Sequence, residues 1–98
     1  MRIPNVLALF TSFLLLSANV TADFDRGLAA YSTADYGTAV REFKASAEQG
    51  DPDSQFWLGT MYEEGSGVLQ DYKEAVKWYT KAAEQGNNAA QERLGFMY

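Results

Sequence analysis

Carboxylates and a short glycine-rich segment are the groups in this chain whose types and spacing could do chemistry. Asp51 and Asp53 flank a proline, and Glu63 and Glu64 are adjacent, so either pair could hold calcium or act as an acid and a base. A calcium-binding loop needs oxygen ligands at alternate positions over about 12 residues and a closing Glu, and no segment offers that pattern. We therefore interpret the four carboxylates as helix caps and solvated helix ends.

The segment 65–67, Gly-Ser-Gly, could be a phosphate-binding loop. Such a loop follows a strand and continues into Gly-Lys-Ser/Thr, whereas this one follows a helical pattern, so we interpret it as a turn that ends a helix. The chain has no His and no Cys, which removes the commonest metal ligands, general bases and thiol nucleophiles. No Ser is followed three residues later by Lys, the motif of penicillin-binding enzymes. The sequence thus predicts no cofactor, no metal site and no enzyme activity.

The elements that carry these residues repeat with a shift of 36 residues. Between segments 35–62 and 71–98, 13 of 28 positions are identical, including Asp-Tyr at the start, Ala-Glu-Gln-Gly in the middle and Leu-Gly-x-Met-Tyr at the end. A fixed period of about 20 to 50 residues is typical of solenoids, in which each unit buries its apolar face against its neighbours. No segment alternates with a period of two. We predict an all-α fold, an α-solenoid of antiparallel helix pairs.

Helix signals divide the repeats into five predicted helices. The first covers 23–32 and leads into a turn, and the others begin after the N-caps Asp35, Asp51 and Asp71 and near Ala89. Glycine ends the second helix, and residues 65–67 end the third near residue 64. The predicted apolar stripes contain Ala39, Val40, Phe43, Ala47, Leu58, Met61, Tyr62, Ala75, Val76, Tyr79, Ala82 and Ala83, with Val68 between helices.

Aromatic residues and two helical glycines refine the predicted core. Helical spacing predicts a core position for Phe24, Tyr31, Tyr36, Phe43, Tyr62, Tyr72 and Tyr79. A core position is less certain for Trp78, because the matching residue in the first unit is Glu42. Glycine inside a helix costs about 1 kcal/mol relative to alanine. Because both Gly59 and Gly95 follow a Leu, we predict close helix packing there, with Tyr79 or Trp78 filling the space beside Gly59.

Residues 1–22 have the pattern of a secretory signal peptide. Arg2 supplies a positive charge, 6–16 is an apolar run of 11 residues, and Ala22 is a small residue suited to cleavage. The run is too short for a spanning helix, which needs about 20 apolar residues. We predict cleavage after Ala22, a periplasmic or secreted mature protein, and no membrane insertion after cleavage.

The predicted mature chain of 76 residues has 7 basic and 13 acidic residues, a net charge of −6. This charge argues against nucleic acid or anionic lipid as a partner and favours a basic one. The domain organisation expected is a signal peptide (1–22), an N-terminal helix (23–34) and repeats (35–98). Because so short a chain buries only about 60% of its unfolded surface, we expect further repeats to follow in a longer protein.

The motif in residues 51–86 resembles a known repeat. It reads Asp-x-x-Ser-Gln-x-x-Leu-Gly-x-x-Tyr-x-x-Gly-x-Gly-Val, followed by Gln-Asp, Ala, Trp-Tyr and Lys-Ala-Ala-Glu-Gln-Gly, and is similar to the Sel-like repeat, a relative of the tetratricopeptide repeat. The resemblance extends over 35–98, although Ser54 and Leu69 depart from the usual alanine and proline. It implies an α-solenoid that binds proteins or peptides. Cysteine-rich secreted relatives have been linked to β-lactam binding, but this chain lacks their cysteines.

Positions that differ between the two units indicate a candidate partner-binding face. In this family the first helix of each pair lines the concave face, and the differing positions there are Phe56, Trp57, Thr60, Glu92 and Arg93. These side chains could form an apolar and charged groove for a peptide. In the alternative interpretation, Phe56 and Trp57 pack on the preceding helix near Tyr31 and Phe43.

We therefore predict an exported, non-enzymatic scaffold that binds a protein or peptide partner through a helical groove. The first alternative is a secreted cell-wall or β-lactam hydrolase. The second is the targeting module of a longer enzyme.

Overall fold

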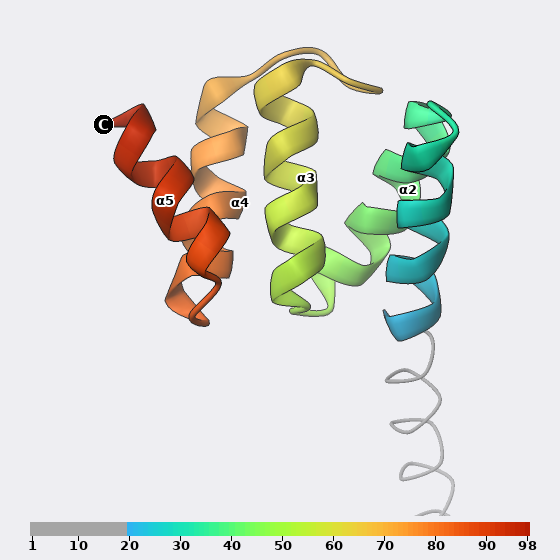
Figure 1. Cartoon of the computed structure of the whole chain (residues 1–98), viewed down its shortest axis with the longest axis horizontal. Helices are drawn as coiled ribbons and strands as arrows, with labels where there is room; N and C mark the ends of the chain where they lie inside the picture. The colour runs from blue at the N-terminus through green and yellow to red at the C-terminus, as the bar shows by residue number, and fades with distance from the viewer. Residues whose placement is uncertain (1–19) are drawn as a thin grey trace, which may run out of the picture.

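The structure, a computed structural model, describes residues 20–98 and consists there of helices joined by short turns. The N-terminal helix occupies residues 20–32 and is followed by α2 (Tyr36–Glu48), α3 (Pro52–Glu64), α4 (Tyr72–Glu84) and α5 (Asn88–Met97). Within the described range no strand is present, which confirms the all-α prediction. The helices α2, α3, α4 and α5 contact one another in chain order, and α5 lies at the end away from α2 (Figure 1).

The helix starts follow the cap residues that the sequence predicts. Asp35, Asp51 and Asp71 each accept a hydrogen bond from the backbone N–H three residues later, and Asn87 does the same for α5. Pro52 occupies the first turn of α3, where its missing N–H costs no hydrogen bond. The helix ends at Glu64, and Gly65, which follows it, adopts the left-handed conformation with φ of 72°.

Two apolar clusters form the core. The first lies between the N-terminal helix, α2 and α3, with one residue from α4, and is built from Ala30, Ala39, Val40, Phe43, Ala47, Leu58, Met61 and Trp78. The second lies between α3, α4 and α5, and is built from Ala75, Tyr79, Ala82 and Ala90. Val68 packs against the first cluster, as predicted. Because successive clusters share α3 and α4, each helix pair is stabilised mainly by its neighbours.

At Gly59, α3 and α4 pack closely against each other. A Cβ atom at residue 59 would lie 2.8 Å from Cδ1 of Tyr79 and 3.2 Å from the carbonyl oxygen of Ala75. No real Cβ tolerates a contact of 2.8 Å with a ring that is itself fully buried. The prediction that Gly59 makes room for an aromatic side chain of the partner helix is therefore confirmed, and the side chain is Tyr79.

Four sequence-based expectations need correction. Tyr36 and Tyr72 are exposed, not core, because each is the first residue of its helix and lies beside the N-cap, away from the packed face. Gly95 has no atom within 4 Å of a built Cβ, because no described helix packs on that side of α5. The first helix already extends through residues 20–22.

Trp78 is 8% exposed and belongs to the core, although Glu42 occupies the matching position. The predicted apolar segment at residues 6–16 lies outside the described residues. None of the helices in the range 20–98 is both long and apolar enough to cross a membrane.

Candidate functional site

Three of the five predicted partner-binding residues line one cavity. Phe56, Thr60 and Arg93 surround a hollow of about 350 Å³ together with Glu63, Glu64 and Tyr72. Phe56, Thr60 and Glu63 follow each other at spacings of four and three residues, so they share one face of α3. Tyr72 is supplied by the start of α4 and Arg93 by α5, so three helices build the cavity.

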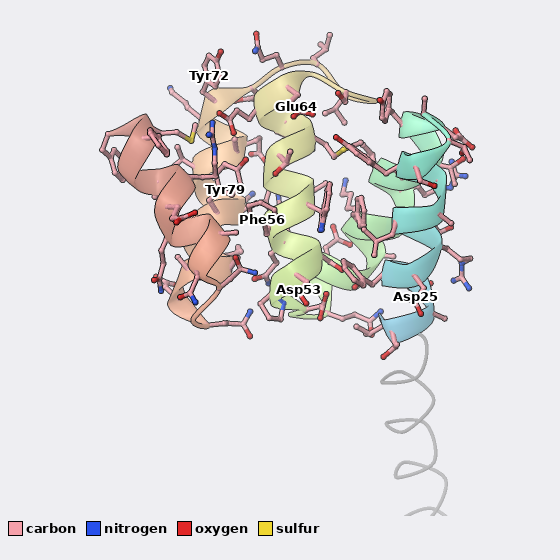
Figure 2. All side chains as sticks on the ribbon, viewed as in Figure 1. Asp25, Asp53, Phe56, Glu64, Tyr72 and Tyr79 are labelled. Carbon is pink, nitrogen blue, oxygen red and sulfur yellow. The ribbon has the colours of Figure 1, made fainter. Side chains whose placement is uncertain are left out.

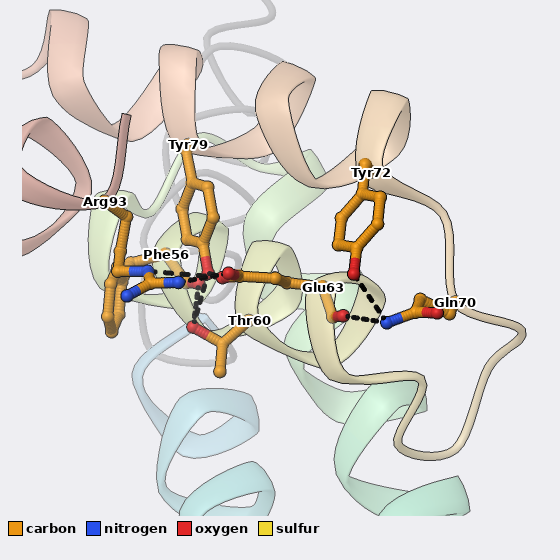
Figure 3. Close-up of polar contacts among 7 residues, drawn as sticks. All are labelled: Phe56, Thr60, Glu63, Gln70, Tyr72, Tyr79 and Arg93. Carbon is orange, nitrogen blue, oxygen red and sulfur yellow. Dashed lines mark hydrogen bonds and ion pairs between the residues drawn. The ribbon is translucent and has the colours of Figure 1, made fainter. Parts of the chain in front are cut away.

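A polar network forms the floor of this cavity (Figure 3). The hydroxyl of Tyr79 donates a hydrogen bond of 2.7 Å to Oε1 of Glu63 and lies 3.1 Å from Oγ1 of Thr60. Nε of Arg93 donates to the same Glu63 oxygen at 3.3 Å, and its Nη2 forms an ion pair with Oε2. The carboxylate of Glu63 thus links α3 to both α4 and α5.

The electrostatics of the network keep it in one protonation state at neutral pH. Burial favours the neutral form of Glu63, but hydrogen bonds from Arg93 and Tyr79 and the Arg93 charge outweigh it and lower the pKa of Glu63 below its ordinary value. Burial, together with the neighbouring Glu63 carboxylate and despite the Thr60 hydrogen bond, raises the pKa of Tyr79 to about 12. Hydrogen bonding and charge attraction from Glu63 raise the pKa of Arg93. At neutral pH the phenol therefore stays protonated and the ion pair stays charged.

The rim of the cavity is aromatic and acidic. Phe56 is half-buried, and its ring centroid lies 5.7 Å from that of Tyr79. Tyr72 is 58% exposed, and its hydroxyl oxygen accepts a hydrogen bond of 3.1 Å from Nε2 of Gln70. Gln70 also donates to the backbone oxygen of Glu63 at 2.9 Å, which fixes the loop before α4 against α3. Figure 2 shows the labelled side chains of Phe56, Glu64 and Tyr72 on these neighbouring helices.

The structure places the other two predicted residues elsewhere. Trp57 stacks on Phe43 with centroids 5.8 Å apart and meets Tyr31 edge-on at 4.9 Å. This is the alternative packing on the preceding helix that the sequence left open, and it turns Trp57 toward the first core cluster. Glu92 is exposed and lies in a separate hollow with Gly95 and Phe96. The five residues therefore do not form one continuous groove.

Sequence comparison alone missed Glu63, Glu64 and Tyr72 as members of the cavity. Glu64, like Glu63, lies beyond the aligned segment. Glu63 lies one residue beyond the last aligned pair, 62 and 98, so the repeat gave it no counterpart. Tyr72 is identical to Tyr36, which suggested a role in the scaffold. The available signal was helical spacing, because Glu63 follows Thr60 by three residues on the same helix face.

The side chains of the cavity are of the types that contact a bound partner. It combines two aromatic walls, a guanidinium held in place by a carboxylate, and the additional carboxylate of Glu64. Within residues 20–98, no group of three or more acidic side chains is arranged to hold a metal ion. The hollow therefore offers aromatic surface, hydrogen-bond donors and a negative charge to a bound group. The fold and this cavity define the chain as an α-solenoid scaffold.

Comparison with known proteins gives the family. The family model described as the Sel1 repeat matches residues 52–87, which is α3, α4 and their connections. A solved protective antigen of uropathogenic Escherichia coli strains, with an SLR fold, is 38% identical with a TM-score of 0.79 over 81% of this chain. A solved Sel1 repeat protein from Oxalobacter formigenes is 35% identical with a TM-score of 0.78 over 81% of this chain. Residues 52–87 therefore carry a Sel1 repeat, and the chain is similar to Sel-like repeat proteins in sequence and fold.

These relatives are much longer than the present chain, which spans 18% of the first and 24% of the second. Among proteins with curated descriptions, none matches. Sel1 repeat proteins are generally non-catalytic helical scaffolds, and the helical repeat architecture of this chain is of that kind.

Proposed function

We propose that this protein is an exported scaffold that binds a protein or peptide partner in the cavity between α3, α4 and α5. The observation that carries the proposal is the convergence of Phe56, Tyr72 and Arg93 from three helices on one hollow. Aromatic residues and Arg are the side chains most often found at the centre of binding interfaces. The Sel1 repeat match supports a role in protein interaction at the level of the family.

The ion pair with Glu63 suits Arg93 to recognition because it fixes the long side chain before a partner arrives. Binding then costs less side-chain entropy than it would with a free arginine. A guanidinium has five N–H donors, and the Glu63 carboxylate takes only part of them. The remaining donors can bind backbone carbonyl groups of a peptide that crosses the cavity.

Charge favours a basic partner. The predicted mature chain has a net charge of −6, and the cavity contains two carboxylates for one guanidinium. Because Arg93 neutralises Glu63, the exposed carboxylate of Glu64 is available to a Lys or Arg of the partner. The aromatic walls would contact the apolar stem of that side chain.

Export is the second part of the proposal and rests on residues 1–22. Their charged start, apolar run and final Ala follow the signal peptide pattern, and they lie almost wholly outside the described residues. Fractionation of the producing cells with N-terminal sequencing of the mature protein tests this part. We expect a mature N-terminus at Asp23 in the periplasmic or extracellular fraction, and intact protein confined to the cytosol would contradict it.

Selection of peptides from a random library tests the binding site without a named partner. We expect selected peptides to be rich in Lys or Arg next to apolar residues. Their affinity, measured by calorimetry, should fall at least about tenfold with Glu64→Lys combined with Tyr72→Ser, since an opposite charge and an aromatic wall are lost together.

The matched control combines Glu84→Lys with Leu69→Ser. Both residues are exposed and lie outside the cavity, so this pair changes charge and apolar surface by similar amounts. The control should bind the selected peptides as the unchanged protein does. Equal affinity of all three proteins, or equal loss in both variants, would refute the cavity as the binding site.

A further inference from the structure

A hollow of about 650 Å³ lies between the end of α2, the start of α3 and the second half of α4. It shares no residue with the cavity around Tyr72. Each of the three helices packs on a described helix on both of its sides, so the walls of the hollow are fixed by their neighbours. Its lining consists of Ala47, Glu48, Gly50, Gln55, Lys77, Trp78 and Lys81.

Glutamine side chains hold the floor of this hollow in place. Gln55 is 4% exposed, and its Nε2 donates a hydrogen bond of 3.2 Å to the carbonyl oxygen of Ala47. Nε2 of Gln85 donates to Oε1 of Gln55 and to the carbonyl oxygen of Gly50, both at 2.9 Å. The end of α2 is therefore fixed against α3 and α4 before a ligand arrives, which lowers the cost of ordering the site on binding.

Two lysines gather around one indole ring in the wall of the hollow. Nζ of Lys77 lies 5.5 Å and Nζ of Lys81 lies 5.8 Å from the ring centroid of Trp78. Contacts of this kind attract an ammonium group to the face of an aromatic ring. Lys77 forms an ion pair of 3.6 Å with Glu74, but no carboxylate of residues 20–98 forms an ion pair with Lys81. The indole thus keeps two positive charges together, and only one of them has an ionic partner.

The repeat indicates that the scaffold does not require this arrangement. Trp78 corresponds to Glu42 and Lys81 to Ala45 of the first unit, although both units build the same helix of 13 residues. The indole with its two lysines therefore occurs in the second unit alone. A group of side chains that the fold does not need is a candidate for ligand binding.

Charge is distributed unevenly between the helices of each pair. Of the 7 basic residues in the predicted mature chain, five lie in α2 and α4, whereas α3 has none and carries three acidic residues. Lys73, Lys77 and Lys81 follow one another at a spacing of four residues and so share one face of α4. In a chain with a net charge of −6, this face offers an acidic group the opposite charge.

The size and composition of the hollow favour a peptide over a compact anion. Its volume falls in the range of about 300–1,000 Å³ that is typical of pockets for whole organic ligands, and is far larger than one carboxylate or phosphate group. The exposed carboxylate of Glu48 lines the same hollow. It would repel a group with two negative charges, but it can accept hydrogen bonds from peptide N–H groups.

We propose that this hollow binds an acidic segment of a partner protein, with an Asp or Glu side chain of that segment lying between Lys77 and Lys81. The carboxylate accepts charge-assisted hydrogen bonds from the two ammonium groups, and neighbouring backbone N–H groups of the segment donate to Glu48. The hollow selects the charge opposite to that selected by the cavity around Tyr72, and neither proposal depends on the other. The protein can thus hold a basic and an acidic partner on different helices.

Titration of the isotope-labelled protein with a short acidic peptide tests the proposal. The chain has two tryptophans, so two indole N–H resonances distinguish Trp78 from Trp57. The probe is the capped peptide Gly-Ala-Glu-Glu-Ala-Gly, and the control peptide has Gln in place of both Glu. We expect the acidic peptide to shift the Trp78 resonance until it saturates and to leave that of Trp57 in place. The Gln peptide should shift neither.

Lysine variants locate the site. Lys77→Met with Lys81→Met keeps the apolar stems but removes both charges, and should raise the dissociation constant at least about fivefold. The matched control, Lys44→Met with Lys73→Met, changes the net charge equally at exposed residues outside the lining. It should bind the acidic peptide as the unchanged protein does. The proposal is overturned if Trp78 does not respond, if both pairs of substitutions have the same effect, or if the Gln peptide binds equally.

Two further titrations exclude other occupants. Inorganic phosphate that shifts the Trp78 resonance at lower concentration than the acidic peptide would identify a compact anion as the ligand, and would overturn the proposal. A shift of the same resonance with protein concentration alone would identify a second copy of the chain as the occupant, and would also overturn it.

Discussion

Gly59 and Tyr79 fix the distance between α3 and α4, because the tyrosine ring occupies the space where any other residue would have a Cβ atom. Alanine is the better helix former by about 1 kcal/mol. Even so, we expect Gly59→Ala to lower the free energy of unfolding by about 1–3 kcal/mol, since an added methyl must displace a fully buried ring. Urea unfolding followed by circular dichroism measures the change.

Gly95→Ala is the matched control for that substitution, since it changes the equivalent residue of the repeat where the Cβ meets nothing. At this position the substitution changes only the helix propensity. The Gly95→Ala variant should therefore be more stable than the unchanged protein by up to about 1 kcal/mol. Opposite signs at the two glycines are the expected result. A destabilised Gly95→Ala, or an unaffected Gly59→Ala, would show that ring insertion is not what the glycine provides.

Glu63 should make the stability of the protein sensitive to acid. Its pKa is lowered in the folded state, so its contribution is present above the ordinary value of 4.5 and is lost as the pH falls below it. We expect Glu63→Gln to cost about 1–3 kcal/mol at pH 7, where a charged hydrogen-bond acceptor is removed. The cost should shrink toward pH 3, because the carboxyl of the unchanged protein is then also neutral.

Arg93→Met provides the second arm of a double-mutant cycle with Glu63→Gln. The two changes should be non-additive, because they remove the same ion pair. If the cost of Glu63→Gln were the same at pH 3 and pH 7, the ionised carboxylate would not be the source of the stabilisation.

Trp57 should contribute to the free energy of unfolding and not to partner binding. Its ring contacts Phe43 and Tyr31, and a Trp→Ala change in such a cluster costs about 3 kcal/mol or more. We expect a large fall in the urea midpoint for Trp57→Ala and a small one for Trp57→Phe, which keeps the stacking. If Trp57→Ala left the stability unchanged but weakened peptide binding, Trp57 would belong to the binding face and not to the core.

Much of the fold was predictable because the signals are local. The caps Asp35, Asp51 and Asp71 act on the three residues that follow them, and the helical stripe containing Phe43 repeats at Tyr79. Repetition also predicted the packing at Gly59. The repeat gave a wrong prediction for Tyr72. This residue is identical to Tyr36 because both stand at the start of a helix, and not because both are buried.

The cavity was only partly predictable, because its members meet across helices. Phe56, Thr60 and Arg93 were found as positions that vary between the units. Nothing local indicates that Arg93 of α5 reaches Glu63 of α3, 30 residues earlier, or that Trp57 turns away from Phe56 toward Tyr31. Both depend on the rotation of each helix against its neighbour, which follows from packing and not from spacing.

The most direct test of the proposed function is the calorimetric affinity of library-selected peptides for three proteins: unchanged, Glu64→Lys with Tyr72→Ser, and the control Glu84→Lys with Leu69→Ser. The account predicts basic, partly apolar peptides that lose at least about tenfold in affinity only with the first pair of substitutions. Peptides that bind all three proteins equally would contradict a binding site between α3, α4 and α5.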